Sequence, residues 1–431
     1  MGVSAFWREL RSESRPAGWP DGVPLTFGDH YTLCLSDAAV DDARMHIVVG
    51  ARMPGPPPTP RALRGLVADR VAHAPVLAYR LAGAGRRLRW VPDPAFEPAD
   101  HVEYHRLSPG QSPHQAVVAA MRDRPLSRGR PLWSLLVLHG YTSDEHLLCY
   151  RAHHAFQDGL GVLSAVRALT GDESLPHPVP DSGSPVRVPG ATRRALGDLA
   201  RLMPGPPRWY TSGDPGTLLP RLHVGSLAIT PFREIARESG AGLAQIALAV
   251  VAGALGEWTA VTAPERAPRR GMTVPMPVSL RGRRGNTGLG NQVGLMPVVL
   301  PCAEPSPRDR LRRVVEQTSL DRVLLCRRGS REIYRAPPGL VRPILRCVLP
   351  FANARSATRL DVSVLRWKGE FPGGRDRFSV PPLAPGSAGM IMIMSGDTDV
   401  SVSAVFEPGV RHTDRLLPLL RQALGELHAA V

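Results

Sequence analysis

The sequence predicts an α/β protein in two parts, and three observations lead to this expectation. The chain has 431 residues, which is more than one ordinary hydrophobic core holds. Short apolar runs of strand character alternate with longer runs of helical spacing. Between the two parts, residues 172–220 are dense in proline and glycine. We therefore expect an N-terminal half at 1–175, a linker with one basic helix at 176–220, and a C-terminal half at 221–431.

The N-terminal half is expected to alternate strands and helices after a weakly patterned start. In residues 1–44 only Tyr31–Leu35 suggests a short strand. A helix is expected to begin after Thr59, because threonine is a good N-cap and Pro60 suits the first helical position. The other elements expected here are a strand at Met45–Gly50, a hairpin of Val76–Leu81 with Arg87–Val91, a helix from Ser112 to Met121, strands at Leu135–Leu138 and Leu147–Tyr150, and a helix at Leu160–Leu169.

The linker helix at Ala191–Met203 has Leu196, Leu199 and Met203 on one face and arginines elsewhere. Such a helix can lie on a membrane, but we expect it to pack against its own protein. In the second half we expect strands at Leu222–Ile229, Thr273–Arg281, Met296–Leu300, Met390–Met394 and Val400–Phe406, and helices from Pro231 and at Leu243–Leu255, Arg308–Leu325 and Thr413–Ala430.

The most informative stretch lies between the strand at 147–150 and the helix at 160–169. It reads His-His-Ala-Phe-Gln-Asp-Gly, residues 153–159. Neighbouring side chains of an extended backbone point to opposite faces, so His153 and His154 cannot both enter one pocket. A neutral imidazole suits general-base catalysis, because its pKa lies near the operating pH. Asp158 is placed to cap the following helix, and Gly159 permits a close backbone approach or a positive φ.

Two other interpretations of the histidines compete with catalysis. A metal site is suggested by the nearby His139 and His146, but their spacing matches no common zinc pattern, and we expect no metal. A pair of buried core histidines is the second rival, and it would be favoured if His-His stood alone. The complete seven-residue pattern between a strand and a helix favours catalysis instead.

The turn resembles the HHxxxDG motif of a superfamily that includes chloramphenicol acetyltransferase, peptide-synthetase condensation domains and the bacterial wax ester synthase/diacylglycerol acyltransferases. Further resemblance to the last family is carried by Trp90-Val91, Phe96, His101-Val102, Pro125-Leu126, Pro131-Leu132-Trp133, Ser279-Leu280-Arg281 and Gly290-Asn291-Gln292. It implies two chloramphenicol-acetyltransferase-like halves, each a mixed sheet flanked by helices, with the active-site tunnel between them. We expect Trp133 to pack in the core.

The resemblance also assigns roles within the turn. His154 would be the catalytic base, and His153 would be a packed neighbour. Asp158, followed by Gly159, would hold the turn through an ion pair without touching substrate. Arg281 is the partner that we expect for Asp158.

The reaction implied by the resemblance is acyl transfer from a CoA or carrier-protein thioester to a hydroxyl or an amine, without a bound cofactor. No serine or cysteine stands in a nucleophile motif, so we expect no acyl-enzyme. The oxyanion that forms needs hydrogen-bond donors, and Asn291 and Ser395 are the candidates.

Two segments depart from the wax ester synthase/diacylglycerol acyltransferase pattern. Ala244-Gln245 stands where the family has an Asn-Asp pair, and residues 363–367 read Ser-Val-Leu-Arg-Trp in place of Ser-Asn-Val-Pro-Gly. We therefore expect a specialised acceptor, such as a natural product. The alternatives are a neutral-lipid synthase and a non-catalytic, condensation-like binding module.

The charge of the chain favours anionic partners. The formal net charge is +15, and Lys368 is the only lysine, so arginine makes up 52 of the 53 basic residues. CoA phosphates, an acidic carrier protein or an anionic membrane surface would suit this charge. Nucleic acid is not expected, because aromatic residues make up only 5% of the chain and no nucleic-acid-binding motif is present.

Cysteine usage and the terminus predict a cytoplasmic location, with peripheral membrane contact as a further option. Five scattered cysteines without CxxC spacing argue for reduced thiols. Residues 1–20 lack the apolar segment of a signal peptide. No uninterrupted apolar stretch reaches about 18 residues, so no membrane-spanning helix is expected.

Overall fold

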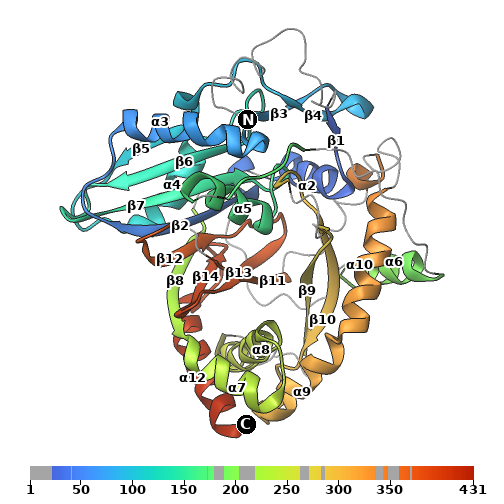
Figure 1. Cartoon of the computed structure of the whole chain (residues 1–431). Helices are drawn as coiled ribbons and strands as arrows, with labels where there is room; N and C mark the ends of the chain where they lie inside the picture. Colours follow the sequence, from blue (N-terminus) through green and yellow to red (C-terminus); the bar gives the residue numbers. More distant parts are fainter. Residues whose placement is uncertain are drawn as a thin grey trace.

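The computed structural model describes residues 22–39, 41–171, 173–178, 189–202, 219–262, 271–282, 287–335, 343–347, 359–368 and 371–431. Most of the expected linker and Met203 of its helix lie outside these residues. A five-stranded sheet in the order β12-β2-β7-β6-β5 forms the upper part of the molecule (Figure 1). Its strands are β12 (Arg375–Val380), β2 (His46–Pro54), β7 (Glu145–His153), β6 (Trp133–His139) and β5 (Val102–Arg106). The β5–β6 pairing is parallel and the others are antiparallel, so this sheet is mixed, as expected.

The helices of this half begin where the sequence places their caps. They are α3 (Pro60–Arg70), α4 (Pro113–Asp123) and α5 (Gly159–Thr170). The side chains of Thr59, Ser112 and Asp158 each accept a hydrogen bond from a backbone N–H three residues later, which satisfies a donor that the helix itself cannot pair. The expected hairpin is also confirmed, as β3 (Tyr79–Ala82) with β4 (Arg89–Pro92), joined by the short β1 (Val23–Pro24).

The core of the upper half is built around Trp133, which is fully buried. Its ring lies parallel to those of His101 and Tyr150, at centroid distances of 4.5 and 5.6 Å. Its indole N–H donates to the Leu77 carbonyl at 2.7 Å, so the one polar atom of the ring is satisfied. Trp133 therefore packs in the core, as expected.

The lower half contains a second mixed sheet, in the order β11-β13-β14-β8 (Figure 1). These strands are β11 (Arg359–Arg366), β13 (Ser387–Ser395), β14 (Asp399–Phe406) and β8 (Arg221–Ala228), and they share a core with α7 (Ile229–Ser239), α8 (Leu243–Thr262) and α12 (Leu416–Ala430). A separate antiparallel pair, β9 (Met272–Ser279) and β10 (Val293–Leu300), carries α9 (Pro307–Gln317), α10 (Leu320–Tyr334) and α6 (Ala191–Leu202) on its outer side.

The C-terminal part of the chain contributes one strand to the upper sheet. β12 lies beyond residue 221 in the sequence, yet it pairs with β2 at the edge of the upper sheet. Gly50 of β2 allows this, because a side chain there would meet the Phe378 ring of β12 at 2.9 Å. The upper sheet is therefore completed by the C-terminal part of the chain.

The expected strand at Tyr31–Leu35 is wrong, because these residues lie inside a helix, α2 (Phe27–Ala38). A short apolar run suits either a strand or a helix. Leu33, Cys34 and Leu35 are three consecutive buried residues of this helix. A reciprocal capping box between Thr26 and Asp29 starts it. This helix was the main element missed in the N-terminal half.

Two expected helices in the rest of the chain also need correction. The single helix expected at Arg308–Leu325 is two helices, because α9 ends at Gln317 and α10 begins at Leu320, with Thr318 and Ser319 between them. In α6 the predicted face points the wrong way, because Leu196 is 54% exposed. The small residues Ala191 and Ala195 pack instead, against Gly329 of α10, where any side chain would collide with the Ala191 carbonyl.

The long apolar helix α8 forms the centre of the lower core. Its stretch Leu243–Val261 is long and apolar enough to cross a membrane by length and composition, and 67% of that stretch is buried inside the protein. None of the five cysteines forms a disulfide with another described residue.

Candidate active site

The His-His turn joins the end of β7 to the start of α5, in the middle of the upper sheet. The backbone N–H of His153 donates to Leu132 at the start of β6, at 3.0 Å. The N–H of His154 donates to the opposite side, to Met45 before β2, at 2.8 Å. Successive residues thus face opposite ways, and the two imidazoles have different surroundings.

His154 is held in the tautomer that a general base needs. Its Nδ1 lies 3.2 Å from the Gln157 carbonyl oxygen, which can only accept, so Nδ1 carries the proton. The lone pair is then on Nε2, which has no hydrogen-bond partner among the described residues. Burial lowers the pKa of this imidazole below its usual value, although the Gln157 carbonyl and Asp158 act in the other direction. His154 is therefore a neutral base at neutral pH.

Asp158 connects the turn to the lower half. The Arg281 guanidinium, at the end of β9, forms an ion pair with its carboxylate at 2.9 Å. The same carboxylate accepts from the backbone N–H groups of Gly161 at 2.8 Å and Gln292 at 2.9 Å. Asp158 and Arg281 have side-chain exposures of only 2% and 5%. The pair expected from the sequence resemblance is thus present, and both charges are buried.

The segment 287–292 is fixed to the turn by the same arginine. Arg281 donates to the Gly290 carbonyl at 2.7 Å, and the Gly290 N–H donates to the Phe156 carbonyl at 2.6 Å. Gly159 allows the other approach, because a side chain there would meet Leu365 of β11 at 2.6 Å. Of the two roles considered for Gly159, close approach is the one that the structure shows.

His153 stands on the opposite face and is fully buried. Its Nδ1 accepts from the Ala155 N–H at 3.0 Å, which puts the ring proton on Nε2, 3.2 Å from the Ser36 hydroxyl of α2 and 3.6 Å from Asp42. Burial alone would raise the pKa of the Asp42 carboxyl, but hydrogen bonds from His153 and His46 lower it well below its usual range. His153 therefore ties α2 and the Asp42 segment to the sheet.

Asn291 follows Gly290, which pairs with Gln157 of the turn. Its side chain is not available as the expected oxyanion donor. Its side-chain amide donates to Thr32 of α2 at 2.8 Å, and its backbone N–H donates to Asp29 at 2.6 Å. Burial raises the pKa of Asp29 to about 6, although N–H groups of Thr26, Asn291 and Trp90 stabilise its charged form. Asn291 thus fastens α2 to the lower half, and the sequence analysis missed these partners on α2. The spacing of Thr26 and Asp29, a capping box, was the signal that could have revealed the helix.

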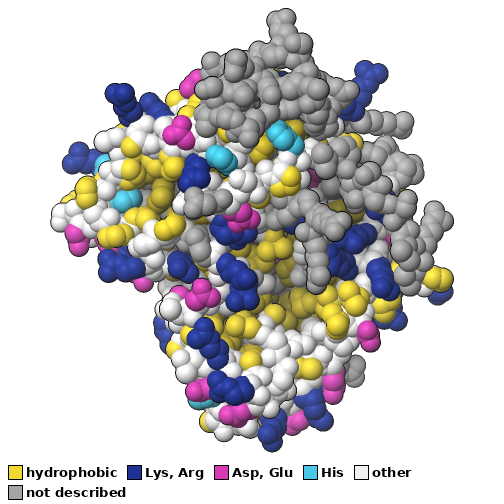
Figure 2. All heavy atoms as spheres, viewed as in Figure 1, with side chains coloured by type: hydrophobic (Ala, Val, Ile, Leu, Met, Phe, Trp, Pro, Cys, Tyr) yellow, Lys and Arg dark blue, Asp and Glu magenta, His cyan; other side chains and the backbone are white. Residues whose placement is uncertain are grey.

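Ser395, the second oxyanion candidate, lines a cavity of about 270 Å³ in the lower half. The cavity lies between the first turn of α8, α7 and the ends of β11 and β13, and its lining comprises Ile229, Arg233, Leu243, Ala244, Val364, Leu365, Arg366, Ser395, Gly396 and Asp397. Figure 2 shows an apolar hollow with arginines around it near the middle of one face of the molecule.

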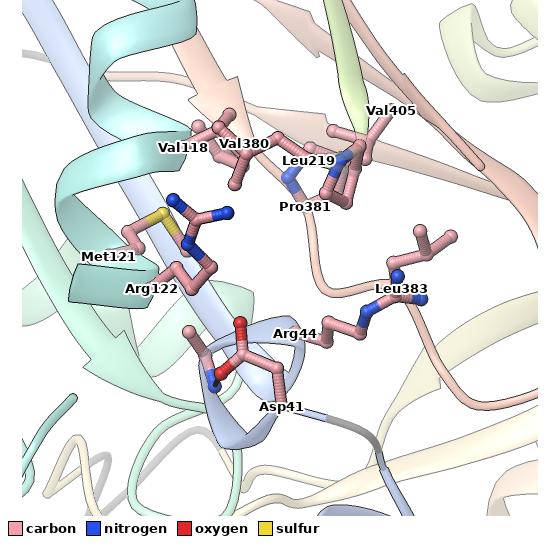
Figure 3. A pocket seen from close by; sticks show the side chains of 12 residues that line it. Asp41, Arg44, Val118, Met121, Arg122, Leu219, Val380, Pro381, Leu383 and Val405 are labelled. Atoms are coloured by element: carbon pink, nitrogen blue, oxygen red, sulfur yellow. Dashed lines mark hydrogen bonds between the residues drawn. The ribbon is translucent and has the colours of Figure 1, made fainter. Parts of the chain in front are cut away.

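A second, much smaller hollow of about 30 Å³ lies where α4 meets β12 and β14 (Figure 3). Met121 and Val118 of α4 line it together with Val380 and Val405. His146 lies seven positions before His153 on β7, about 23 Å away along the strand. His139 is also far from the turn, because its neighbour Leu138 pairs with Leu147 at the His146 end of β7.

Sequence comparison connects this site to known proteins. Residues 39–209 match the family described as the wax ester synthase/diacylglycerol acyltransferase catalytic domain. The Mycobacterium tuberculosis protein tgs1, named as a probable diacylglycerol O-acyltransferase, is 24% identical over 312 residues, 63% of this chain and 66% of that protein. The matched segment, which includes the His-His turn, is thus similar to this acyltransferase family. Rv3087 of the same organism, which has the same activity in its name, is 25% identical over 260 residues, and the match spans 51% of this chain and about half of that protein, 54%.

Comparison with solved structures confirms the expected fold. The wax ester synthase/diacylglycerol acyltransferase of Marinobacter aquaeolei VT8 superposes with a TM-score of 0.59 at 16% identity, covering 94% of this chain and 99% of that one. A starter condensation domain of rhizomide synthetase, solved with C8-CoA, gives 0.63 at 14% identity, with coverages of 95% and 94%. The expected pair of chloramphenicol-acetyltransferase-like halves is therefore confirmed.

Replacing Asp158 by Asn should lower the free energy of unfolding by about 3 kcal/mol, because it leaves the buried Arg281 without its counter-charge. Chemical denaturation would measure this loss. Asp123→Asn, at a carboxyl that is 60% exposed, is the matched control and should change stability little. An Asp158→Asn protein of wild-type stability that differed only in its pH–rate profile would make Asp158 a titrating catalytic group instead.

Replacing His153 by Ala should cost stability rather than chemistry. The change opens a cavity and removes a partner of Ser36 and Asp42, so we expect a loss of about 2–4 kcal/mol. Denaturation and turnover should be measured on the same preparation, beside His154→Ala. If the folded His153→Ala protein lost more activity than His154→Ala, the assignment of the two histidines would be reversed.

Proposed function

We propose that the protein is an acyltransferase that moves an acyl group from a CoA or carrier-protein thioester to a hydroxyl or amine of a specialised acceptor. The observation that carries this proposal is the hydrogen bond from His154 Nδ1–H to the Gln157 carbonyl, which leaves the Nε2 lone pair available. The matched catalytic domain at 39–209 supports the class of reaction.

In the proposed reaction His154 Nε2 takes the proton from the acceptor as its oxygen or nitrogen attacks the thioester carbonyl. The tetrahedral intermediate then collapses, the carbon–sulfur bond breaks, and the departing thiolate receives the proton from the imidazolium. Asp158 contributes by fixing the turn and does not touch the substrate. Asn291 is not retained as an oxyanion donor, because its amide donates to Thr32. Ser395 remains the candidate.

The donor is proposed to be a thioester, and no bound cofactor is needed for this chemistry. Support comes from the structural relative that was solved with C8-CoA and from the formal net charge of +15, which attracts CoA phosphates or an acidic carrier protein. A cytoplasmic location, with peripheral contact to an anionic membrane surface, belongs to the same proposal.

Replacing His154 by Ala should lower kcat about 10²–10⁴-fold, because the general base is removed. His428→Ala, which changes an exposed histidine paired with Glu234, is the matched control and should retain wild-type turnover. Transfer from octanoyl-CoA to a panel of alcohols and amines can be followed by mass spectrometry. A wild-type protein without turnover on any acceptor or thioester would support a non-catalytic binding module.

The pH dependence should report the same imidazole. Since burial lowers the pKa of His154, the neutral base is present down to acidic pH. The rate constant kcat/KM should therefore rise with pH, with a midpoint below the usual 6.5, and be flat near neutrality. A midpoint at or above 6.5, measured with a stable enzyme across the range, would contradict this description of the base.

The acceptor is proposed to be neither a long-chain alcohol nor diacylglycerol. Ala244 and Arg366 both line the 270 Å³ cavity, so the two departures from the family pattern meet in one place. With palmitoyl-CoA, we expect turnover of hexadecanol and of diacylglycerol to stay far below that of the best acceptor in the panel. Comparable turnover of either lipid would favour the neutral-lipid alternative.

A further inference from the structure

The cavity in the lower half combines an apolar wall with a positively charged mouth. Ile229, Leu243, Val364 and Leu365 supply aliphatic surface on the inside. Its charged lining residues are two arginines and one aspartate, all of them exposed. Its volume of about 270 Å³ is at the lower end for ligand sites, which fits a small organic molecule or one end of a longer one.

Arg366 is the unpaired charge at this mouth. It is the last residue of β11, and no described residue forms a hydrogen bond or ion pair with its guanidinium. Arg233 of α7 stands beside the cavity too, and it donates to the Asp397 carbonyl oxygen at 2.6 Å, which uses one of its five N–H groups. Guanidinium groups with free donors bind planar carboxylates through paired hydrogen bonds.

The remaining polar group in the wall is Ser395, whose side chain reaches only the Leu365 carbonyl, at a long 3.5 Å. α8 begins at this wall with Leu243 and Ala244. Its first residues therefore present the positive end of a helix to the cavity. Gln245, the other substituted residue, turns away and bonds to Gly242 and Thr318. The wall thus holds no carboxylate from this helix, which removes a charge that would repel an anion.

One residue of the cavity lining packs against the His-His turn. Leu365 lines the cavity and also contacts Gly159, the last residue of the turn. The side chain of Leu365 therefore separates the cavity from the segment that fixes His154. A whole CoA is much larger than this space, so the cavity suits the smaller of the two substrates.

We propose that this cavity receives an acceptor that carries a carboxylate, which Arg366 and Arg233 bind while the aliphatic part lies against Val364 and Leu365. The hydroxyl or amine of the acceptor then extends toward the His154 turn. This inference rests on the proposed acyl transfer and names the substrate class of the same site.

The test compares two acceptors of equal chain length, ω-hydroxyhexanoate and hexanol, with octanoyl-CoA as donor. Wild-type protein should prefer the hydroxy acid in kcat/KM. The variant Arg366→Gln should lower this preference about tenfold, since a charge-assisted hydrogen bond at an exposed, screened position is lost. Arg366→Lys should retain part of the preference because it keeps the charge. Arg237→Gln, on the exposed side of α7 and away from the cavity, is the matched control and should keep the wild-type preference.

Two outcomes would overturn the inference while the acyltransferase proposal stands. One is an equal preference in wild type and Arg366→Gln. The other is a loss of kcat/KM in Arg366→Gln that depends on the donor, being present with octanoyl-CoA and absent with the octanoyl thioester of N-acetylcysteamine. This result would assign the arginine to a CoA phosphate.

A binding measurement separates the inference from the proposed function. Saturation-transfer NMR should detect hexanoate on the wild-type protein more strongly than hexanol, and Arg366→Gln should weaken the hexanoate signal. If no acceptor is acylated but hexanoate still binds through Arg366, the proposed function fails and the anion site stands. Hexanoate binding that is unaffected by Arg366→Gln overturns the site.

Discussion

The buried ion pair between Asp158 and Arg281 is the constraint on which the geometry of the His-His turn depends. Each member comes from a different half of the chain, and both are almost fully buried. Taking two ions out of water costs several kcal/mol for each, and only dense hydrogen bonding offsets that cost. Here the carboxylate accepts from two backbone N–H groups, and the guanidinium donates to the Gly290 carbonyl. Because Gln157 precedes Asp158, the pair also fixes the carbonyl that orients His154.

Local signals in the sequence were sufficient for elements whose ends are defined by neighbouring residues. Thr59 with Pro60, and Ser112 with Pro113, place two helix starts because a cap acts within one turn. The divergence of His153 and His154 follows from backbone geometry alone. The roles expected within the turn came from resemblance to a family. Arg281 was chosen among the core arginines as the partner of Asp158, since nothing local connects residues 123 positions apart.

Features that depend on distant contacts were not predictable in this way. α2 was taken for a strand because its apolar residues suit either form, and what settles it is a capping box and burial against other segments. Asn291 was assigned to the oxyanion because it is near the turn, but Thr32 and Asp29, about 260 positions away, take its donors. β12 and its pairing with β2 were missed for the same reason.

The crossing of β12 has a consequence for how the chain folds during synthesis. β2 is an interior strand of the finished sheet, but one of its neighbours is made only after most of the lower half. Until then a nascent upper half presents the N–H and C=O groups of β2 as an open edge, the kind of surface on which chains aggregate. The upper sheet is therefore complete only after the C-terminal part of the chain has been made. Cutting the chain between the two halves would leave the upper sheet without β12, whereas the four strands of the lower sheet would all stay on the C-terminal piece.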